Sequence, residues 1–152
     1  NRPGKIVEMD ANYFRESWES GCFGGFLFAK EVIKTFLLEK TAGTLIFTGA
    51  SASLRGKSNF GAFNSAKGAL RNLAQALAKE YAENSIHISH VIVDGGLAGE
   101  RIKQRLSDFE ERVKEGKLIN IENVTDAYMF LYNQSKDAWT FELDVRTSQE
   151  NW

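Results

Sequence analysis

The stretch from Gly43 to Gly96 decides the fold, and it reads GTLIFTGASASLRGKSNFGAFNSAKGALRNLAQALAKEYAENSIHISHVIVDGG. Its opening, Gly43–Gly49, is a short apolar run bounded by glycines, which is typical of a buried strand. After a polar loop, small apolar residues recur at helical spacing over residues 60–83 and predict a tightly packed helix. Ile86–Val93 is again mostly apolar, as expected near the middle of a parallel sheet, and DGGLAG then ends that strand as a loop.

The residues before this stretch predict one long helix. Asp10 is a suitable N-cap, and the apolar stripe that follows it continues to about Lys40. Gly21, Gly24 and Gly25 interrupt the stripe, although a glycine inside a helix costs about 1 kcal/mol relative to alanine. We therefore expect another backbone to approach this helix closely at the glycines.

The residues after this stretch predict two helices and a last strand. Glu100–Glu115 is charged and amphipathic and is followed by Gly116, which indicates a helix that ends there. Asn123 can cap a further helix over residues 124–134. Trp139–Val145 alternates apolar and polar side chains, as a half-buried strand does.

The order of these elements predicts the fold class. Helices alternate with strands, which implies parallel strands joined by right-handed helical crossovers. A parallel sheet is normally covered on both faces, and three strands offer little surface to cover. We therefore expect an α/β protein with a doubly wound, Rossmann-like parallel sheet, of which residues 1–152 form a single partial domain, the C-terminal portion. The first strands are expected to precede Asn1 or to be supplied by something else.

Composition limits the functions that are plausible for the chain. The 152 residues include 19 basic and 20 acidic side chains, for a net charge of -1, so charge gives no reason to expect nucleic acid or a membrane surface as partner. No apolar run reaches the roughly 18 residues that a membrane span needs, and nothing resembles a signal peptide. Cys22 is the only cysteine, which excludes an internal disulfide and favours a cytoplasmic location.

Two motifs resemble a phosphate-binding loop and a metal site, but neither has the residues or spacing that such a site needs. In TGASASLRG, Ala52 and Leu54 stand where a phosphate-binding loop would need glycines. His87 and His90 are three residues apart on one strand, so they are expected to point to opposite faces and not to share a metal ion. We expect no metal site and interpret both as ordinary hydrogen-bonded histidines.

The layout of strand, loop, helix and strand resembles the catalytic half of the short-chain dehydrogenase/reductase family. The family pattern is a strand that ends in serine, a helix that carries Tyr-x-x-x-Lys and a strand that ends in Pro-Gly. The likeness begins in the helix before Gly43 and ends with the strand WTFELDV. It implies that the nucleotide-binding strands, with their glycine-rich turn, lie before Asn1.

The signature residues depart from the family pattern. In the family, tyrosine is the general acid/base, lysine holds the nicotinamide ribose, serine orients the substrate carbonyl and asparagine supports a proton relay. The tyrosine position holds Phe63, the serine position Ala50 and the asparagine position Gly21, while Lys67 retains the lysine. Because phenylalanine has no ionisable hydrogen, it cannot protonate a carbonyl oxygen. A donor such as Ser51, Ser53, a substrate group or an ordered water would have to replace it.

The resemblance implies a set of site positions, each of which also has an ordinary structural explanation. A phenylalanine and a lysine four residues apart are usually a core ring and an extended aliphatic stem. A loop serine such as Ser51 usually bonds its own turn, and Asp-Gly-Gly is a common turn signature. The implied catalytic positions are Lys67, Ser51 and Phe63, and the implied cofactor-binding positions are Lys67, Gly49, Ala50, Asp94, Gly95 and Leu97.

Two functions follow as expectations. The first is an NAD(P)-dependent oxidoreductase, using NAD or NADP, that acts on a small carbonyl, alcohol or enoyl substrate. The second is a catalytically inactive homologue that binds a nucleotide or a partner. The family also pairs through its two long helices, which implies a homodimer or homotetramer through helices 11–39 and 60–83 here.

Overall fold

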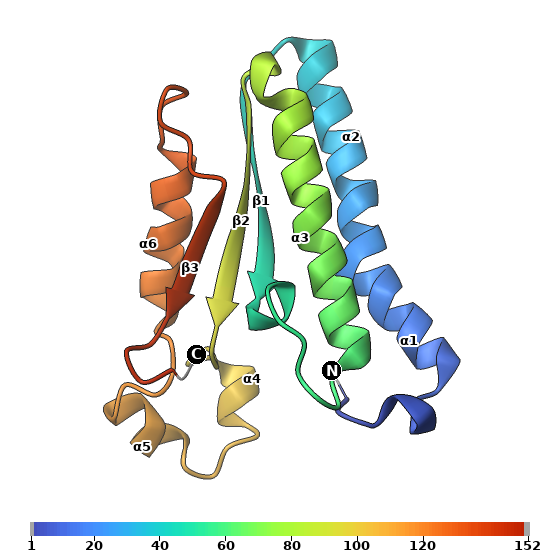
Figure 1. The fold of residues 1–152 in the computed structure, drawn as a ribbon. Helices are drawn as coiled ribbons and strands as arrows, with labels where there is room; N and C mark the ends of the chain where they lie inside the picture. The colour runs from blue at the N-terminus through green and yellow to red at the C-terminus, as the bar shows by residue number, and fades with distance from the viewer. Residues whose placement is uncertain (1, 151–152) are drawn as a thin grey trace.

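The fold, a computed structural model that describes residues 2–150, is a parallel sheet of three strands covered by helices (Figure 1). The strands lie in the order β1-β2-β3, and Gly43 of β1 pairs with Ile86 of β2 while His90 of β2 pairs with Glu142 of β3. The α/β class and the parallel strand arrangement predicted from the sequence are thereby confirmed. The elements are α1 (Ala11–Trp18), α2 (Gly24–Glu39), β1 (Gly43–Ala50), α3 (Gly61–Tyr81), β2 (Ile86–Asp94), α4 (Glu100–Lys103), α5 (Phe109–Lys114), α6 (Ile121–Tyr132) and β3 (Glu142–Arg146).

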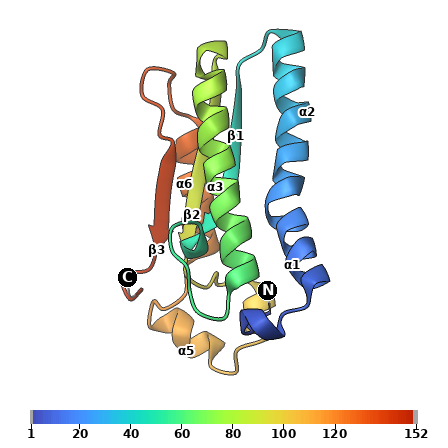
Figure 2. The ribbon, with the colours of Figure 1, turned by 45° about the vertical axis from the view of Figure 1, so that its right-hand side comes forward.

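The helices lie in two layers. Figure 2 shows α3 in front of the sheet, with α1 and α2 beside it, and α6 behind the sheet. The largest buried cluster lies between the sheet and the front layer, where apolar side chains of α2 and α3 pack on β1 and β2. Its buried members are Ala29, Ile33, Leu45, Phe47, Leu70, Ala74, Ile86 and Ile88. Among residues 2–150, no helix combines the length and the apolar character that crossing a membrane requires.

The predicted long helix forms, but a π-helical turn, Glu19–Phe23, separates α1 from α2. Asp10 caps it as predicted, since its carboxylate accepts the N–H groups of residues 12 and 13 at 2.8 and 2.9 Å. A Cβ on Gly21 would lie 2.8 Å from the Cβ of Ala66 in α3, and one on Gly25 would lie 2.8 Å from a methyl carbon of Leu70. The close approach predicted at these two glycines is confirmed, although side-chain carbons make it rather than another backbone. A Cβ on Gly24 would meet only the Glu19 carbonyl of its own helix, so the prediction was wrong there.

The C-terminal third differs from the prediction in its helix boundaries. The expected helix Glu100–Glu115 is broken into α4 and α5, because Ser107 and Asp108 lie in its middle and such side chains favour helix ends over helix interiors. The following helix begins at Ile121, with Asn120 as its cap. Asn123, the predicted cap, instead donates its backbone N–H to the Asn120 side chain at 3.1 Å.

One edge of β1 has no neighbouring strand among the described residues. The N–H of Gly43 donates to Ser85, which precedes β2. Successive residues of a strand direct their peptide groups to opposite sides, so Gly43, Phe47 and Gly49 face β2. By the same alternation, Thr48 and Ala50 direct theirs toward the open edge.

Candidate functional site

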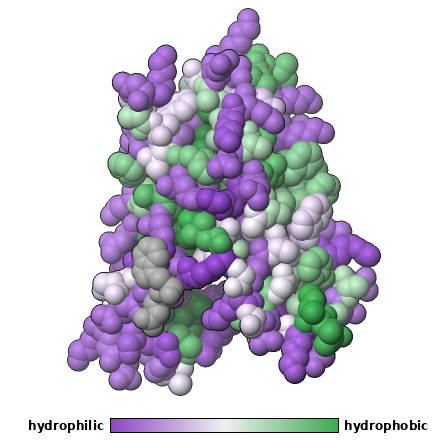
Figure 3. Space-filling view, in the orientation of Figure 1, coloured by the Kyte–Doolittle hydropathy of each residue, from purple (hydrophilic) through white to green (hydrophobic). Residues whose placement is uncertain are grey.

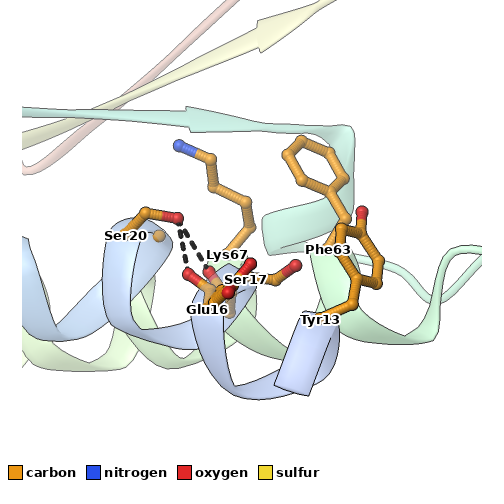
Figure 4. Close-up of a pocket in the computed structure, with 8 residues that line it drawn as sticks. Tyr13, Glu16, Ser17, Ser20, Phe63 and Lys67 are labelled. Atoms are coloured by element: carbon orange, nitrogen blue, oxygen red, sulfur yellow. Dashed lines mark hydrogen bonds between the residues drawn. The ribbon is translucent and has the colours of Figure 1, made fainter. Parts of the chain in front are cut away.

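The first turns of α3 bring Phe63 and Lys67 to one cavity of about 320 Å³, which lies between α3 and α1. Residues four apart lie on the same helix face, so the two side chains emerge together. Gly21 belongs to the same cavity, at the π-helical turn, where its missing side chain allows α3 to approach. In Figure 4, Phe63 and Lys67 extend from α3 on one side, while Tyr13, Glu16, Ser17 and Ser20 lie on the other. The positions that correspond to the family tyrosine, lysine and asparagine therefore share one cavity.

Lys67 is half-buried and makes a specific contact. Its Nζ donates a hydrogen bond of 2.8 Å to the backbone carbonyl of Thr48, one of the groups at the open edge of β1. Burial lowers the pKa of Lys67 because removal of water disfavours the charged ammonium. The ammonium is thus held at the carboxyl-terminal half of β1 rather than released into bulk water.

Phe63 also borders a second cavity of about 380 Å³, formed around the loop after β1. Ser51 lines this second cavity, whereas Lys67 lines only the first. The carbonyl of Ser51 accepts the N–H groups of Leu54 and Arg55 at 3.0 and 3.1 Å, which closes a turn of 3-10 helix. Ser51 and Lys67 therefore border different cavities, and Phe63 borders both.

The residues at the end of β2 and just after it are held by protein contacts. The Asp94 side chain is only 2% exposed and forms ion pairs with Arg55 at 3.1 Å and with Arg146 at 3.4 Å. Gly95 has φ +149°, and a Cβ there would lie 3.2 Å from Ile119. Leu97 forms an isolated bridge with Ile119. The cofactor roles of Asp94, Gly95 and Leu97 stay predictions, and the ion pairs of Asp94 join the loop after β1 to the end of β3.

A polar cluster that the sequence did not reveal lies between α3 and the sheet. Arg71 donates two hydrogen bonds to the carboxylate of Glu142, at 2.6 and 2.8 Å, and the same carboxylate lies 3.0 Å from Nδ1 of His90. His87 lies on the other face, stacked on Trp139 at 4.9 Å, so the predicted opposite orientation of the histidines is confirmed. Within residues 2–150, no three metal-ligating side chains come together. Its members are far apart in the sequence, since Glu142 lies 52 residues from His90 and 71 residues from Arg71.

Contacts within the cluster and its burial shift the pKa values of His90 and Glu142. Burial lowers the pKa of His90, and the hydrogen bond that its Nδ1 donates to Glu142 opposes this only in part. The hydrogen bond from Arg71 lowers the pKa of Glu142, so this carboxyl stays ionised. His90 is therefore predominantly neutral at pH 7, next to a carboxylate and a guanidinium that carry opposite charges.

The lowered pKa of His90 predicts how stability depends on pH. The folded chain binds this proton less readily than the unfolded chain, whose histidine has a pKa of about 6.5. Stability should therefore be retained above about pH 6.5 and lost progressively as the pH falls below that value toward the lowered pKa of the folded chain. Urea unfolding at pH 7.5 and 5.5 measures the change, and His90→Gln should flatten it more than His87→Gln does. An equal pH dependence in all three proteins would contradict the assignment to His90.

Comparison with known proteins finds one matching family and several similar sequences. The family described as "Enoyl-(Acyl carrier protein) reductase" matches residues 1–142. A 2-dehydro-3-deoxy-D-gluconate 5-dehydrogenase of Formosa agariphila is 30% identical over 86 residues, which cover 57% of this chain and 32% of that protein. An L-xylulose reductase of Bos taurus is 25% identical over 114 residues, which cover 72% and 47% of the two chains. The chain thus spans less than half the length of these curated relatives.

Solved structures agree in fold. A short-chain dehydrogenase from Rhodopseudomonas palustris is 36% identical, with a TM-score of 0.74, over 96% of this chain and 57% of that one. A sorbitol-6-phosphate 2-dehydrogenase from Erwinia amylovora superposes with a TM-score of 0.80 at 19% identity, over 99% of this chain and 65% of that one, and shows the likeness of fold alone. The family match over nearly the whole chain, the parallel sheet and the shared cavity of Gly21, Phe63 and Lys67 lead to one conclusion: the chain belongs to the short-chain dehydrogenase/reductase family.

Proposed function

We propose that residues 1–152 form the C-terminal part of an NAD(P)-dependent oxidoreductase that acts on a small carbonyl, alcohol or enoyl substrate. The observation that carries this proposal is Lys67, a half-buried ammonium at the carboxyl-terminal half of β1 in the cavity that also contains Phe63. The relatives named above are dehydrogenases and reductases, which supports the reaction class.

The chemistry of Lys67 fits a cofactor role. An ammonium has three N–H donors, of which Thr48 accepts one, so the others can bind hydroxyl groups of a nicotinamide ribose. Ser17 and Ser20 add hydroxyls to the same cavity. A bound nicotinamide would supply or accept the hydride, and Lys67 would orient it. Both NAD and NADP are compatible with these groups.

A catalytically inactive, nucleotide- or partner-binding homologue is the second candidate, and the three substituted signature positions favour it. Phe63, Ala50 and Gly21 all lack the polar group found there in the family. A positioned acid or base contributes about 10²–10⁴-fold to a rate, so its loss matters. Assays at 340 nm with the full-length protein, over a broad carbonyl and enoyl panel, distinguish the candidates. Turnover supports the oxidoreductase, and no turnover with any substrate overturns it.

Replacing Lys67 by methionine should weaken binding of NADPH by about 10- to 100-fold, because a hydrogen bond from a charged group contributes about 1.5–3 kcal/mol. Titration calorimetry on the full-length protein measures the change. Lys79→Met is the matched control, since Lys79 lies on the exposed end of the same helix. Equal affinity in wild type and Lys67→Met would remove Lys67 from the cofactor site.

Association into a homodimer or homotetramer through helices 11–39 and 60–83 stays a prediction. Apolar side chains gather over the upper part of α2 in Figure 3. Leu27, Phe28 and Leu38 of this helix are exposed. A self-complementary contact across this face would cover them, and sedimentation that gave only monomer would contradict it.

A further inference from the structure

A phenol borders the cavity of Phe63 and Lys67, and it comes from α1 rather than from α3. Tyr13, in the first turn of α1, lines this cavity of about 320 Å³. In Figure 4 the Tyr13 ring extends from α1 toward the side on which Phe63 lies, with its hydroxyl at the far end. The cavity in which α3 lacks the family phenol therefore receives a phenol from the neighbouring helix.

The Tyr13 side chain is held in place, and its proton is not used. Its backbone N–H donates to the carboxylate of Asp10 at 2.9 Å, and the guanidinium of Arg2 lies 5.5 Å from the centre of its ring. The backbone N–H of Arg2 donates to the Tyr13 hydroxyl oxygen at 2.6 Å. Because this oxygen is the acceptor in its hydrogen bond within residues 2–150, the phenol proton is available to an oxygen atom in the cavity.

The other two hydroxyls of the cavity, on Ser17 and Ser20, are less suited to exchange a proton. Ser20 Oγ donates its proton to the backbone carbonyl of Glu16 at 2.8 Å. An aliphatic hydroxyl also needs an adjacent general base to become reactive, whereas a phenol is itself an acid. Among the described groups of this cavity, Tyr13 is therefore the best candidate for a proton donor.

Gly21 allows α1 to come close enough to α3 for this arrangement. A Cβ on Gly21 would lie 2.8 Å from the Cβ of Ala66, so the asparagine of the family pattern would force the two helices apart. Tyr13 lies on the same cavity-facing side of this long helix as Gly21. The departures from the family pattern at Gly21 and Phe63 thus fit one arrangement, in which the phenol is supplied by α1.

We propose that Tyr13 is the acid–base group of the oxidoreductase proposed above, and this inference rests on that function. In carbonyl reduction, the carbonyl carbon receives hydride from the reduced nicotinamide cofactor, and the carbonyl oxygen takes the phenol proton of Tyr13. The side chain is half-buried, so the tyrosinate that is left regains a proton from solvent. Alcohol oxidation runs through the same transfers in reverse.

The first test locates the phenol and does not depend on turnover. ¹³C NMR of the full-length protein, labelled at tyrosine Cζ, reports each phenol, and the Tyr13 signal is assigned by its loss in Tyr13→Phe. Addition of NADPH should shift the Tyr13 signal, because Tyr13 and Lys67 border one cavity. Tyr132, which is exposed at the end of α6, should not respond. A Tyr13 signal that stays in place while NADPH binds overturns the proposal.

The second test removes only the hydroxyl. Tyr13→Phe should lower kcat for carbonyl reduction by the full-length protein about 10-fold and leave KM for NADPH unchanged, because the ring and its packing are kept. This loss is smaller than the 10²–10⁴-fold contribution of a fully positioned acid, since water reaches the half-buried hydroxyl and competes with it. Tyr132→Phe is the matched control and should leave kcat unchanged.

Moving the phenol back to α3 separates a chemical role of Tyr13 from a structural one. The double variant Tyr13→Phe, Phe63→Tyr should recover at least the wild-type kcat, whereas a packing defect at Tyr13 would not be repaired by a hydroxyl on another helix. An unchanged kcat in Tyr13→Phe, in a folded enzyme that turns over, contradicts the role of Tyr13 but not the proposed function. A wild type without turnover on any substrate overturns the proposed function and the role of Tyr13 with it.

Discussion

Replacing Phe63 by tyrosine together with Ala50 by serine is expected to raise the rate of carbonyl reduction by about 10²–10⁴-fold. The double variant Phe63→Tyr, Ala50→Ser supplies both missing hydroxyls, and Phe63 borders the cavity where Lys67 already lies. In Figure 4 the free end of the Phe63 ring extends toward the side on which the Lys67 ammonium lies, so a phenol there would meet a neighbouring positive charge. A nearby cation stabilises phenolate and makes proton exchange at neutral pH easier.

The measurement is kcat/KM on the full-length protein for the substrate panel, with NADPH affinity measured in parallel. Phe109→Tyr in α5 adds the same hydroxyl away from the cavity and is expected to leave the rate unchanged. If the double variant folds and binds cofactor but gains no rate, Lys67 is not placed to assist a tyrosine. If wild type already matches the variant, the inactive homologue is excluded and the chain has its own proton donor.

Replacing Gly49 by alanine is expected to destabilise the fold by about 1–3 kcal/mol, the usual cost of overpacking a filled core. The added Cβ would overlap His90 Nε2 and lie 2.8 Å from Ser53 Oγ. Because His90 is held by Glu142, which Arg71 holds in turn, the ring cannot move aside without breaking those bonds. The measurement is the free energy of unfolding in urea at pH 7.5.

Gly68→Ala is the matched control and should have the opposite sign. Gly68 lies inside α3, and a Cβ built there meets nothing within 4 Å. Alanine removes the conformational cost of glycine in a helix and should stabilise by about 0.5–1 kcal/mol. Equal effects of the two substitutions would show that His90 does not fill the space beside Gly49.

The sequence was most informative where short-range patterns determine the structure. Glycines bounded β1, alanine spacing marked α3, and Asp10 marked the start of α1, because each of these signals depends on neighbours along the chain. The break between α4 and α5 was missed because the apolar stripe continued through Ser107 and Asp108. The preference of Ser107 and Asp108 for helix ends outweighed the helical spacing of the apolar residues around them.

The candidate site could be predicted only in part for the same reason. Lys67 and Phe63 were found because they lie one helical turn apart. Glu142 lies 52 residues from His90 in the chain, and only the pairing of β2 with β3 brings them together. A pattern along the chain cannot show that a histidine and a carboxylate so far apart will share a proton.

The hydrogen bond from Lys67 to Thr48 has a consequence for how the sheet could be extended. The Thr48 carbonyl points to the open edge of β1, and a strand that paired there would bring its own N–H to this oxygen. If that N–H replaced the Lys67 ammonium at the Thr48 carbonyl, one more N–H group of Lys67 could bind a ribose hydroxyl. Amine-reactive labelling of Lys67, with and without an added strand, would measure this exchange. Pairing of a further strand with β1 would thereby change how freely Lys67 can bind a nucleotide.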